Sequence, residues 1–394
     1  MNLSTASRLH PRAQTDTRPG PRPHVCFIAG NIYPVLVGDS GLSFVGGAEV
    51  QQTLQIRALR RAGYPVSVIV RDQGQADLVH HQGVAIHKLP LSGRRGWPGT
   101  RFLYPRMTDL VRLLHRVSPD IVFTQTASEQ VAAAGVFSAL SGTPLVFAGA
   151  SDPDFQKGDL PGMPRWHTIM YRAALRRADR VIVQNTRQQT LLKENFGLDS
   201  RLIQNGYEES GWQPGCASGP VLWAATVKPL KQPLVFIRLA QAFPHRQFVM
   251  VGGPGVSDDA QAYFDEIAAV ARTVPNLRFT GHVPYAEVGP YFDGAALAVN
   301  TSIYEGFPNT FLQAWLRGVP TVSFVAPESS PGRSGTQACA DFDAMVREVG
   351  RLTGSPAAWQ SASAACSAFF QEHHTMDAAL QRYGEVFDGL APAR

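Results

Sequence analysis

Short apolar runs rich in β-branched residues alternate with amphipathic stretches along the first half of the chain. Such runs are typical of buried strands, whereas apolar positions that recur every three or four residues are typical of helices with one buried face. The pattern predicts strands at residues 24–29, 66–70, 120–124, 145–148 and 180–184. It predicts helices at about 46–62, 101–117, 127–141, 166–178 and 186–196.

A second series of the same kind follows in the other half of the chain. The predicted strands span residues 221–225, 247–251, 277–281, 297–300 and 321–324. The predicted helices lie near 232–243, 258–274, 285–294, 309–317, 341–353 and 356–372. Regular alternation of strand and helix indicates parallel sheets with helices on both faces. Two series therefore predict two doubly wound, Rossmann-like α/β domains.

The stretch from Asn205 to Pro220 separates the two series, because it is rich in Gly, Pro and Ser and has no apolar period. We therefore place a first domain at 24–205 and a second at 206–374. A last helix at 375–390 follows a break and is expected to pack back onto the first domain. Residues 1–23 are polar and lack the apolar core of a secretory signal, so they are predicted to form a flexible tail.

Composition narrows the class of protein. Hydrophobic residues make up 44% of the 394 positions, which excludes general disorder. No apolar run reaches the length of a membrane-spanning helix. The four cysteines are scattered, with neither metal-site nor disulfide spacing, which favours a reducing cytoplasm. We therefore expect a cytoplasmic location.

Charge is unevenly distributed between the two halves. Residues 1–200 hold 23 Lys and Arg against 14 Asp and Glu, whereas the remainder is slightly acidic. The basic excess indicates either an anionic partner or an ordinary solvated surface.

The predicted helix at 101–117 carries one basic face, and two interpretations of it stay open. It either rests on an anionic membrane surface, peripheral to the inner leaflet, or it is a core helix with a solvated face. No nucleic-acid partner is expected.

Three turns that leave predicted strands or enter helices carry candidate chemistry. Gly46 and Gly47 begin a helix, where bare backbone lets a ligand approach the N–H groups, although taken alone they are better explained by a simple glycine turn. No Gly-x-Gly-x-x-Gly motif follows the first strand, so a nicotinamide or flavin cofactor is not expected. We expect no resident cofactor of another kind.

The second turn follows the first strand of the second domain. Thr226, Lys228 and Lys231 lie in this short loop, and the two lysines are the only ones in the domain. Two ammonium groups at the carboxyl end of a strand can hold a diphosphate as a pair of point charges. The alternative is a surface loop with ordinary lysines.

The third turn, at residues 300–316, is the most informative. Glu305 and Gly306 form a turn, and Pro308 suits the first position of a helix. The free N–H groups of the next helix turn then offer an anion site at the positive end of its dipole. The Gln313 amide is expected one turn further along, where it can meet hydroxyl groups. The candidate anion ligands are the backbone groups of Phe307, Asn309 and Thr310.

At these residues the chain resembles the retaining GT-B glycosyltransferases of family four (glycosyl transferases group 1). The string SIYEGFPNTFLQAWLRGVPTV at 302–322 resembles their donor-binding signature. GGAE at 46–49, ADRVIVQNT at 178–186, Asn-Gly at 205–206, the lysine loop at 226–233 and VGG at 251–253 follow in the family's order. The resemblance covers roughly residues 24–390 and implies a GT-B fold, with two Rossmann-like domains facing each other across a cleft.

The resemblance also implies roles for single residues. The family carries two glutamates eight positions apart; Glu305 matches the first, near the donor sugar, and Gln313 stands where the second holds the ribose. Lys231 matches the family's lysine. The arginine that usually contacts the diphosphate is replaced by Thr226, with Lys228 as a candidate substitute. The family's first-domain histidine has no clear counterpart.

Two Asp-x-Asp strings remain to be placed. Asp152 follows a first-domain strand and either faces the sugar or acceptor as a catalytic residue or simply forms a turn. Asp341 and Asp343 are expected to cap a helix.

The implied activity is transfer of a sugar, with retention and without a metal, from a UDP- or GDP-linked donor. The acceptor would be a glycan or a lipid-linked saccharide, as in surface polysaccharide assembly. Two alternatives stay open: a nucleotide-sugar epimerase of the same fold, and a non-catalytic protein that binds a sugar nucleotide.

Overall fold

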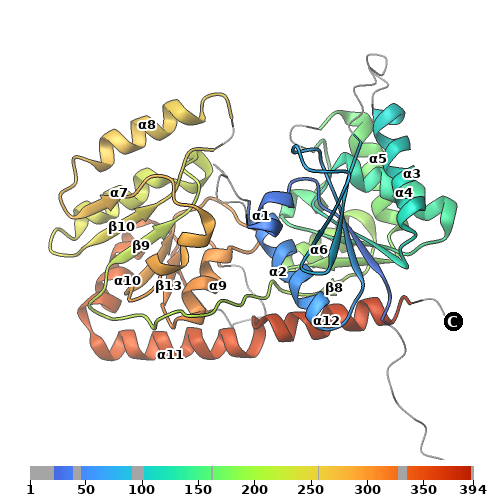
Figure 1. Cartoon of the computed structure of the whole chain (residues 1–394). Helices are drawn as coiled ribbons and strands as arrows, with labels where there is room; N and C mark the ends of the chain where they lie inside the picture. The colour runs from blue at the N-terminus through green and yellow to red at the C-terminus, as the bar shows by residue number, and fades with distance from the viewer. Residues whose placement is uncertain are drawn as a thin grey trace, which may run out of the picture.

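The computed structural model describes residues 22–38, 46–90, 102–160, 163–255, 257–326 and 335–391. Two lobes lie side by side, each with a sheet and covering helices, and α11 and α12 run beneath both (Figure 1). Most of the predicted tail at 1–23 falls outside the described residues. Among the described residues, no helix is both long and apolar enough to cross a membrane.

Eight strands of the described chain form the first sheet, in the order β3-β4-β2-β1-β5-β6-β7-β8. All neighbours in it are parallel except β3 and β4. The strands are β1 Val25–Ile28, β2 Val66–Val70, β3 Leu78–His81, β4 Val84–Lys88, β5 Ile121–Gln125, β6 Leu145–Ala148, β7 Arg180–Val183 and β8 Arg201–Leu202. Its helices are α1 Tyr33–Val37, α2 Gly47–Arg61, α3 Thr108–Val117, α4 Glu129–Ser141, α5 Arg165–Arg177 and α6 Thr186–Phe196.

The second sheet is parallel throughout, in the order β11-β10-β9-β12-β13-β14. Its strands are β9 Val221–Ala224, β10 Phe248–Val251, β11 Leu277–Phe279, β12 Leu297–Asn300, β13 Thr321–Ser323 and β14 Thr336–Ala338. Its helices are α7 Pro233–Ala242, α8 Ala260–Ala271, α9 Asn309–Leu316, α10 Phe342–Gly354 and α11 Pro356–His373. The predicted fold class, two Rossmann-like α/β domains, is confirmed.

The sequence predicted parallel sheets, and this prediction is wrong at one edge of the first sheet. β3 pairs antiparallel with β4 across a tight turn, in which Gln82 and Gly83 both have positive φ. β3 lies at the sheet edge and leaves alternate residues exposed, so it lacks the continuous apolar run that marks a buried strand.

Two predicted helices are wrong in part, and proline is the reason in both. Residues 285–294 form two short 3₁₀ turns, Tyr285–Glu287 and Gly289–Tyr291, because Pro290 supplies no N–H to a longer helix. Regular α3 begins only at Thr108, after a distorted segment that contains Pro105.

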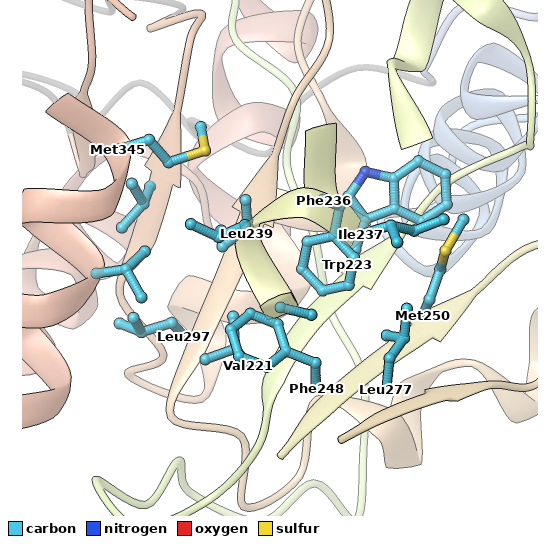
Figure 2. Close-up of a cluster of buried hydrophobic side chains, with 14 of the residues drawn as sticks. Val221, Trp223, Phe236, Ile237, Leu239, Phe248, Met250, Leu277, Leu297 and Met345 are labelled. Carbon is cyan, nitrogen blue, oxygen red and sulfur yellow. The ribbon is translucent and has the colours of Figure 1, made fainter. Parts of the chain in front are cut away.

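The core of the second domain reaches directly into the loops that follow its strands. Figure 2 shows Trp223 of β9 beside residues of α7 and β10 in this cluster, and Trp223 is 2% exposed. Its indole Nε1 donates to Thr301 Oγ1 at 3.0 Å, and that hydroxyl donates to the carbonyl of Lys231 at 2.6 Å. The core therefore ties together the loops after β9 and β12.

The chain crosses between the lobes twice, and the two crossings lie side by side. Tyr207 forms a parallel bridge with Thr375, and its N–H donates to the His374 carbonyl at 2.9 Å. α12, Met376–Asp388, then contacts α2 and adds Val386 and Phe387 to the core of the first sheet. The division of the chain at residues 205 and 374 stays a prediction.

His374 fills the space between the crossings and is fully buried. Its Nδ1 bonds to the Asn205 carbonyl at 3.0 Å, while its ring packs against Phe307, Trp315 and Phe369. The pKa of His374 is lowered to about 3, mainly by burial and to a smaller extent by the neighbouring His373 and Arg382, while the hydrogen bond to Asn205 acts in the opposite direction. The folded protein therefore holds this imidazole neutral.

A buried neutral histidine makes stability dependent on pH. Unfolded His374 takes up a proton below about pH 6.5, while the folded form does so only near pH 3, so stability falls as the pH drops through this window. At pH 5 this difference in protonation lowers the free energy of unfolding by about 2 kcal/mol relative to neutral pH. We expect the Tm of the wild type to fall more steeply between pH 7 and 5 than that of His374→Gln, which keeps a donor for Asn205. Parallel Tm curves for the two proteins would contradict this origin.

Candidate active site

Glu305 is the carboxylate of the loop that follows β12, and it has three hydrogen-bonding partners. Its Oε1 accepts hydrogen bonds from Ser302 Oγ at 2.6 Å and Asn300 Nδ2 at 3.1 Å, and it also pairs with Lys231 Nζ. Asn300 is fixed in turn, because its Oδ1 accepts from the Ser302 N–H at 2.8 Å. The carboxylate is therefore held in one orientation by three donors.

The lysine loop meets this carboxylate from the neighbouring strand. After β9 the chain forms a 3₁₀ turn at Pro229–Lys231 with Lys228 at its N-cap. Lys231 pairs with Glu305, and both side chains are less than one fifth exposed. Lys228 has no carboxylate partner of this kind in the described part of the chain. Burial, and then the nearby Lys231, lower the pKa of Lys228.

The amino end of α9 lies against the glycine turn of the first domain. Asn309 Nδ2 donates to the Gly47 carbonyl, and Asn309 Oδ1 accepts from Gln51 Nε2, both at 2.8 Å. Helix α9 begins at Asn309, so the prediction that Pro308 is its first residue is wrong: Pro308 is the N-cap, with an extended backbone. The start of α2 and the start of α9 thus face each other across the two domains.

A cavity of about 340 Å³ opens between these elements. Most of the residues singled out in the sequence line it, although they come from three separate segments. They are Gly46, Gly47, Thr226, Lys228, Lys231, Glu305, Phe307, Pro308, Asn309, Thr310 and Gln313. The cavity therefore combines two ammonium groups, a helix amino terminus and a carboxylate.

Two of the proposed residues lie elsewhere. Asp152 and Gly306 line a second cavity of about 400 Å³, and Glu305 belongs to both cavities. Asp152 pairs with Arg187 at 2.8 Å; its burial raises the pKa of its carboxyl, which Arg187 partly offsets. Glu305 is thus the residue through which the two cavities adjoin.

Sequence reasoning missed part of the wall of the first cavity. Tyr285 was placed within a continuous helix, and Asn300 was treated only as a strand residue. Asn300 is the last residue of β12 and Tyr285 lies in the segment that follows β11, and this position at the carboxyl ends of parallel strands is the signal that could have indicated them. The other wall residues that the sequence analysis did not assign to the site are Val50, Ala224, Ala225, Pro254, His282, Val283 and Val288, while Val251, Gly252 and Gly253 entered it only as part of the family resemblance.

Other candidate groups have structural roles. Asp341 caps α10 by accepting from the Ala344 N–H at 2.7 Å, as expected. All four cysteines are free. Over the described ranges, no set of three or more His, Cys, Asp or Glu side chains is arranged to hold a metal ion.

The basic face before and along α3 is largely paired where it is described. Arg106 forms an ion pair with Glu129, and Arg112 with Asp109. Leu110, Leu113 and Leu114 are buried on the other face of α3. Residues 91–101, which hold the remaining basic positions before this helix, lie outside the described part of the chain.

Family models account for both halves of this architecture. The model described as "Glycosyl transferase 4-like domain" matches residues 46–206, and that described as "Glycosyl transferases group 1" matches residues 221–355. The chain belongs to the GT-B glycosyltransferases. A comparison with curated protein sequences finds no match.

Solved structures share the fold of this glycosyltransferase at low sequence identity. Sucrose-phosphate synthase from Thermosynechococcus elongatus superposes with a TM-score of 0.74 and 17% identity, covering 94% of this chain and 99% of that one. Anabaena HepE in complex with UDP and glucose gives 0.70 and 16%, covering 93% and 100%. The catalytic domain of Arabidopsis thaliana starch synthase IV, bound to ADP and acarbose, gives 0.67 and 14%, covering 95% and 100%.

At Gly306 the loop that carries Glu305 lies directly against the first domain. A Cβ at this position would lie 2.0 Å from the Ala150 carbonyl oxygen, and the Gly306 carbonyl accepts from Asn185 Nδ2 at 3.3 Å. We expect Gly306→Ala to push the domains apart at the site and lower turnover by about tenfold or more, since misplacement of about 1 Å is costly.

The matched control is Gly255→Ala, whose Cβ would make only ordinary van der Waals contacts, at 3.6 Å with Ala260 Cβ and at 3.9 Å with Thr226 Cγ2. Its turnover and Tm should stay near those of the wild type. A Gly306→Ala protein with unchanged turnover would show that the close contact between the domains does not matter for the site.

Proposed function

We propose that this glycosyltransferase moves a sugar from a UDP- or GDP-linked donor to a glycan or lipid-linked saccharide, with retention and without a divalent metal. The observation that supports it is the 340 Å³ cavity, in which Lys228, Lys231 and the amino end of α9 surround one space. HepE in complex with UDP and starch synthase IV bound to ADP share the fold, which agrees with a nucleoside-diphosphate donor.

The charges in the cavity match the charge that develops in such a reaction. Cleavage of the bond between the anomeric carbon and the diphosphate leaves negative charge on the leaving group and positive charge on the sugar ring. Two ammonium groups, of which that of Lys231 is held by Glu305, and a helix amino terminus can stabilise the diphosphate with little reorganisation. Glu305, held by three donors, lies beside them, where its negative charge can stabilise the sugar.

The second cavity is the candidate place for the acceptor. It adjoins the donor cavity at Glu305 and carries Asp152 and Arg187 on the first-domain side. We assign Asp152 to bind an acceptor hydroxyl. In this scheme the departing phosphate takes the proton of the attacking hydroxyl on the face that the leaving group occupied, which gives retention without a strong protein base.

Contact with an anionic membrane is a further part of the proposal. The first half of the chain carries the basic excess, and a lipid-linked acceptor would be presented at a membrane surface. Cosedimentation with vesicles containing anionic lipid, compared with neutral vesicles, tests this part separately.

A product assay tests the activity itself. The protein is first screened by thermal shift against UDP, GDP, ADP and their sugar conjugates, because a bound ligand raises the apparent stability. The stabilising conjugate is then incubated with saccharide acceptors in the presence of EDTA. Nucleoside diphosphate together with an extended acceptor supports the proposal. A changed sugar without transfer indicates an epimerase, and binding without any product indicates a non-catalytic protein.

We expect Glu305→Ala and Lys231→Ala to lower kcat/KM by roughly 100-fold or more, because each removes a preorganised charge from the donor cavity. Each change leaves a largely buried charge unpaired, so Tm should fall, but the protein should stay folded because the other loop contacts remain. Lys193→Ala is the matched control, because Lys193 pairs with Asp199 on the surface. Rates like the wild type in either site variant would refute the assignment.

The lowered pKa of Lys228 predicts how donor binding depends on pH. Lys228 loses its proton at a lower pH than an ordinary lysine, so diphosphate affinity should weaken as the pH rises through the alkaline range. The arginine in Lys228→Arg stays charged throughout the alkaline range, so the affinity of this variant for the diphosphate should change much less with pH. The dissociation constant of the best-binding diphosphate, measured from pH 7 to 10, checks this. Equal slopes would exclude Lys228 as the titrating contact.

A further inference from the structure

Helix α5 presents apolar side chains to solvent on the outer side of the first lobe. Figure 1 shows α3, α4 and α5 on the side of this lobe that faces away from the second lobe. Trp166 and Ile169 lie in the first half of α5 and are 37% and 66% exposed. Residues three and four positions apart share one face of a helix, so Ala173, also exposed, continues the same stripe. The buried residues of α5 lie on its opposite face; they are Thr168, Tyr171, Ala174 and Leu175.

Basic side chains accompany this stripe, and α5 contains no acidic residue. Arg165, Arg172 and Arg176 follow one another at intervals of seven and four positions, so they lie along one flank of the stripe. Arg177 lies at its carboxyl end. A basic helix with an aromatic side chain on its apolar face is typical of a helix that lies on a membrane surface.

Most of this positive charge is not neutralised by a carboxylate. Of the arginines of α5, only Arg165 forms an ion pair within the described residues, with Asp159. Arg172 donates to backbone carbonyls of the preceding loop. Arg176 and Arg177 are exposed and have no carboxylate partner in the part of the chain that the structure describes.

The other basic helix of this lobe lacks the apolar component. Arg112 of α3 is paired with Asp109, and none of the exposed large apolar side chains lies on this helix. Among the described helices of the basic half of the chain, α5 therefore combines exposed tryptophan, exposed isoleucine and unpaired arginine on one face.

α5 is joined directly to the segment that carries Asp152. Tyr171 Oη donates to the Asp154 carbonyl at 2.8 Å, within the 3₁₀ turn Asp152–Phe155. Asp152 lines the second cavity, which is the candidate place for the acceptor. A surface that holds α5 therefore also sets the distance between that surface and the second cavity.

The side chains of this face indicate what kind of surface suits it. Indole rings favour the interface between lipid headgroups and acyl chains. Guanidinium groups bind phosphate oxygens through paired hydrogen bonds. An anionic bilayer offers phosphate groups and an apolar layer together, which matches the arginine flank and the apolar stripe of α5.

We propose that the outer face of α5 is the surface by which this glycosyltransferase binds an anionic lipid bilayer. Trp166 and Ile169 enter the headgroup region, and Arg172, Arg176 and Arg177 contact the lipid phosphates. This inference rests on the membrane contact in the proposed function and names the surface that makes it. With α5 on the bilayer, the turn that carries Asp152 is held at a fixed height above the lipid, where a lipid-linked saccharide is presented.

Cosedimentation with vesicles measures this contact on the full-length protein. The vesicles contain phosphatidylglycerol and phosphatidylcholine in equal parts, or phosphatidylcholine alone. The wild type should bind the anionic vesicles, and added salt should weaken the binding because it screens the attraction. Arg176→Glu combined with Arg177→Glu should weaken binding to the anionic vesicles by roughly tenfold or more.

The matched control makes the same change in net charge on the second lobe. Arg272→Glu combined with Arg347→Glu reverses two exposed arginines, one at the end of α8 and one on α10. Binding of this control should stay within about threefold of the wild type, because charges far from the contact are screened. The Tm of both double variants should stay within a few degrees of the wild type, which shows that they fold.

Tryptophan fluorescence tests whether α5 itself enters the bilayer. In anionic vesicles made with brominated phosphatidylcholine, bromine quenches an indole that enters the lipid. The quenching should be lost in Trp166→Phe and kept in Trp212→Phe, because Trp212 is equally exposed, at 37%, but lies between β8 and β9. Ile169→Ser should weaken binding severalfold without altering its salt dependence, because it removes apolar contact and no charge.

Each outcome has a distinct meaning. If the Arg176 and Arg177 double variant binds like its control, or if quenching persists in Trp166→Phe, the α5 surface is wrong while the membrane contact itself stands. A wild type that stays in solution with anionic vesicles would overturn the inference together with the membrane part of the proposed function, and would favour an acidic protein on this face. Sugar transfer is tested independently, by the product assay with soluble saccharides.

Discussion

The ion pair between Lys231 and Glu305 is the constraint on which the rest of the site depends. It joins the loops that follow two adjacent parallel strands, β9 and β12, and both partners are mostly withdrawn from water. A pair in such surroundings keeps its geometry only if its other hydrogen-bonding groups are satisfied. Asn300 and Ser302 do this for the carboxylate, and Thr301 fixes the backbone of the lysine loop.

The hydrophobic core extends this rigidity into the cavity. Trp223 belongs to the core of the second sheet, yet its indole N–H ends at Thr301, one hydrogen bond from the lysine loop. Preorganised charge of this kind is effective because it does not have to reorganise as the reaction proceeds. In this glycosyltransferase a buried tryptophan of the core and the polar loops of the site therefore form one continuous structure.

The sequence was sufficient for much of the fold and of the donor cavity, for a physical reason. Buried parallel strands leave apolar runs such as Val66–Val70, and ligands gather where such strands end, which indicated Lys231 and Glu305 in advance. The β3–β4 hairpin left no such signal. Other features depend on contacts between segments that are distant in the sequence, which no local pattern encodes. They are the hydrogen bonds that join Gln313 through Tyr207 and Glu209 to Arg317, the burial of His374, and the second cavity.

The adjacent crossings at Tyr207 and Thr375 have a mechanical meaning. Two adjacent connections form a hinge, so rotation of one lobe relative to the other has one preferred axis, which runs through these connections. Phe307, whose ring centre lies 4.8 Å from that of His374, places the loop after β12 close to these crossings. Displacement grows with distance from an axis, so the parts of the two lobes far from the crossings move more in such a rotation than the loops beside them.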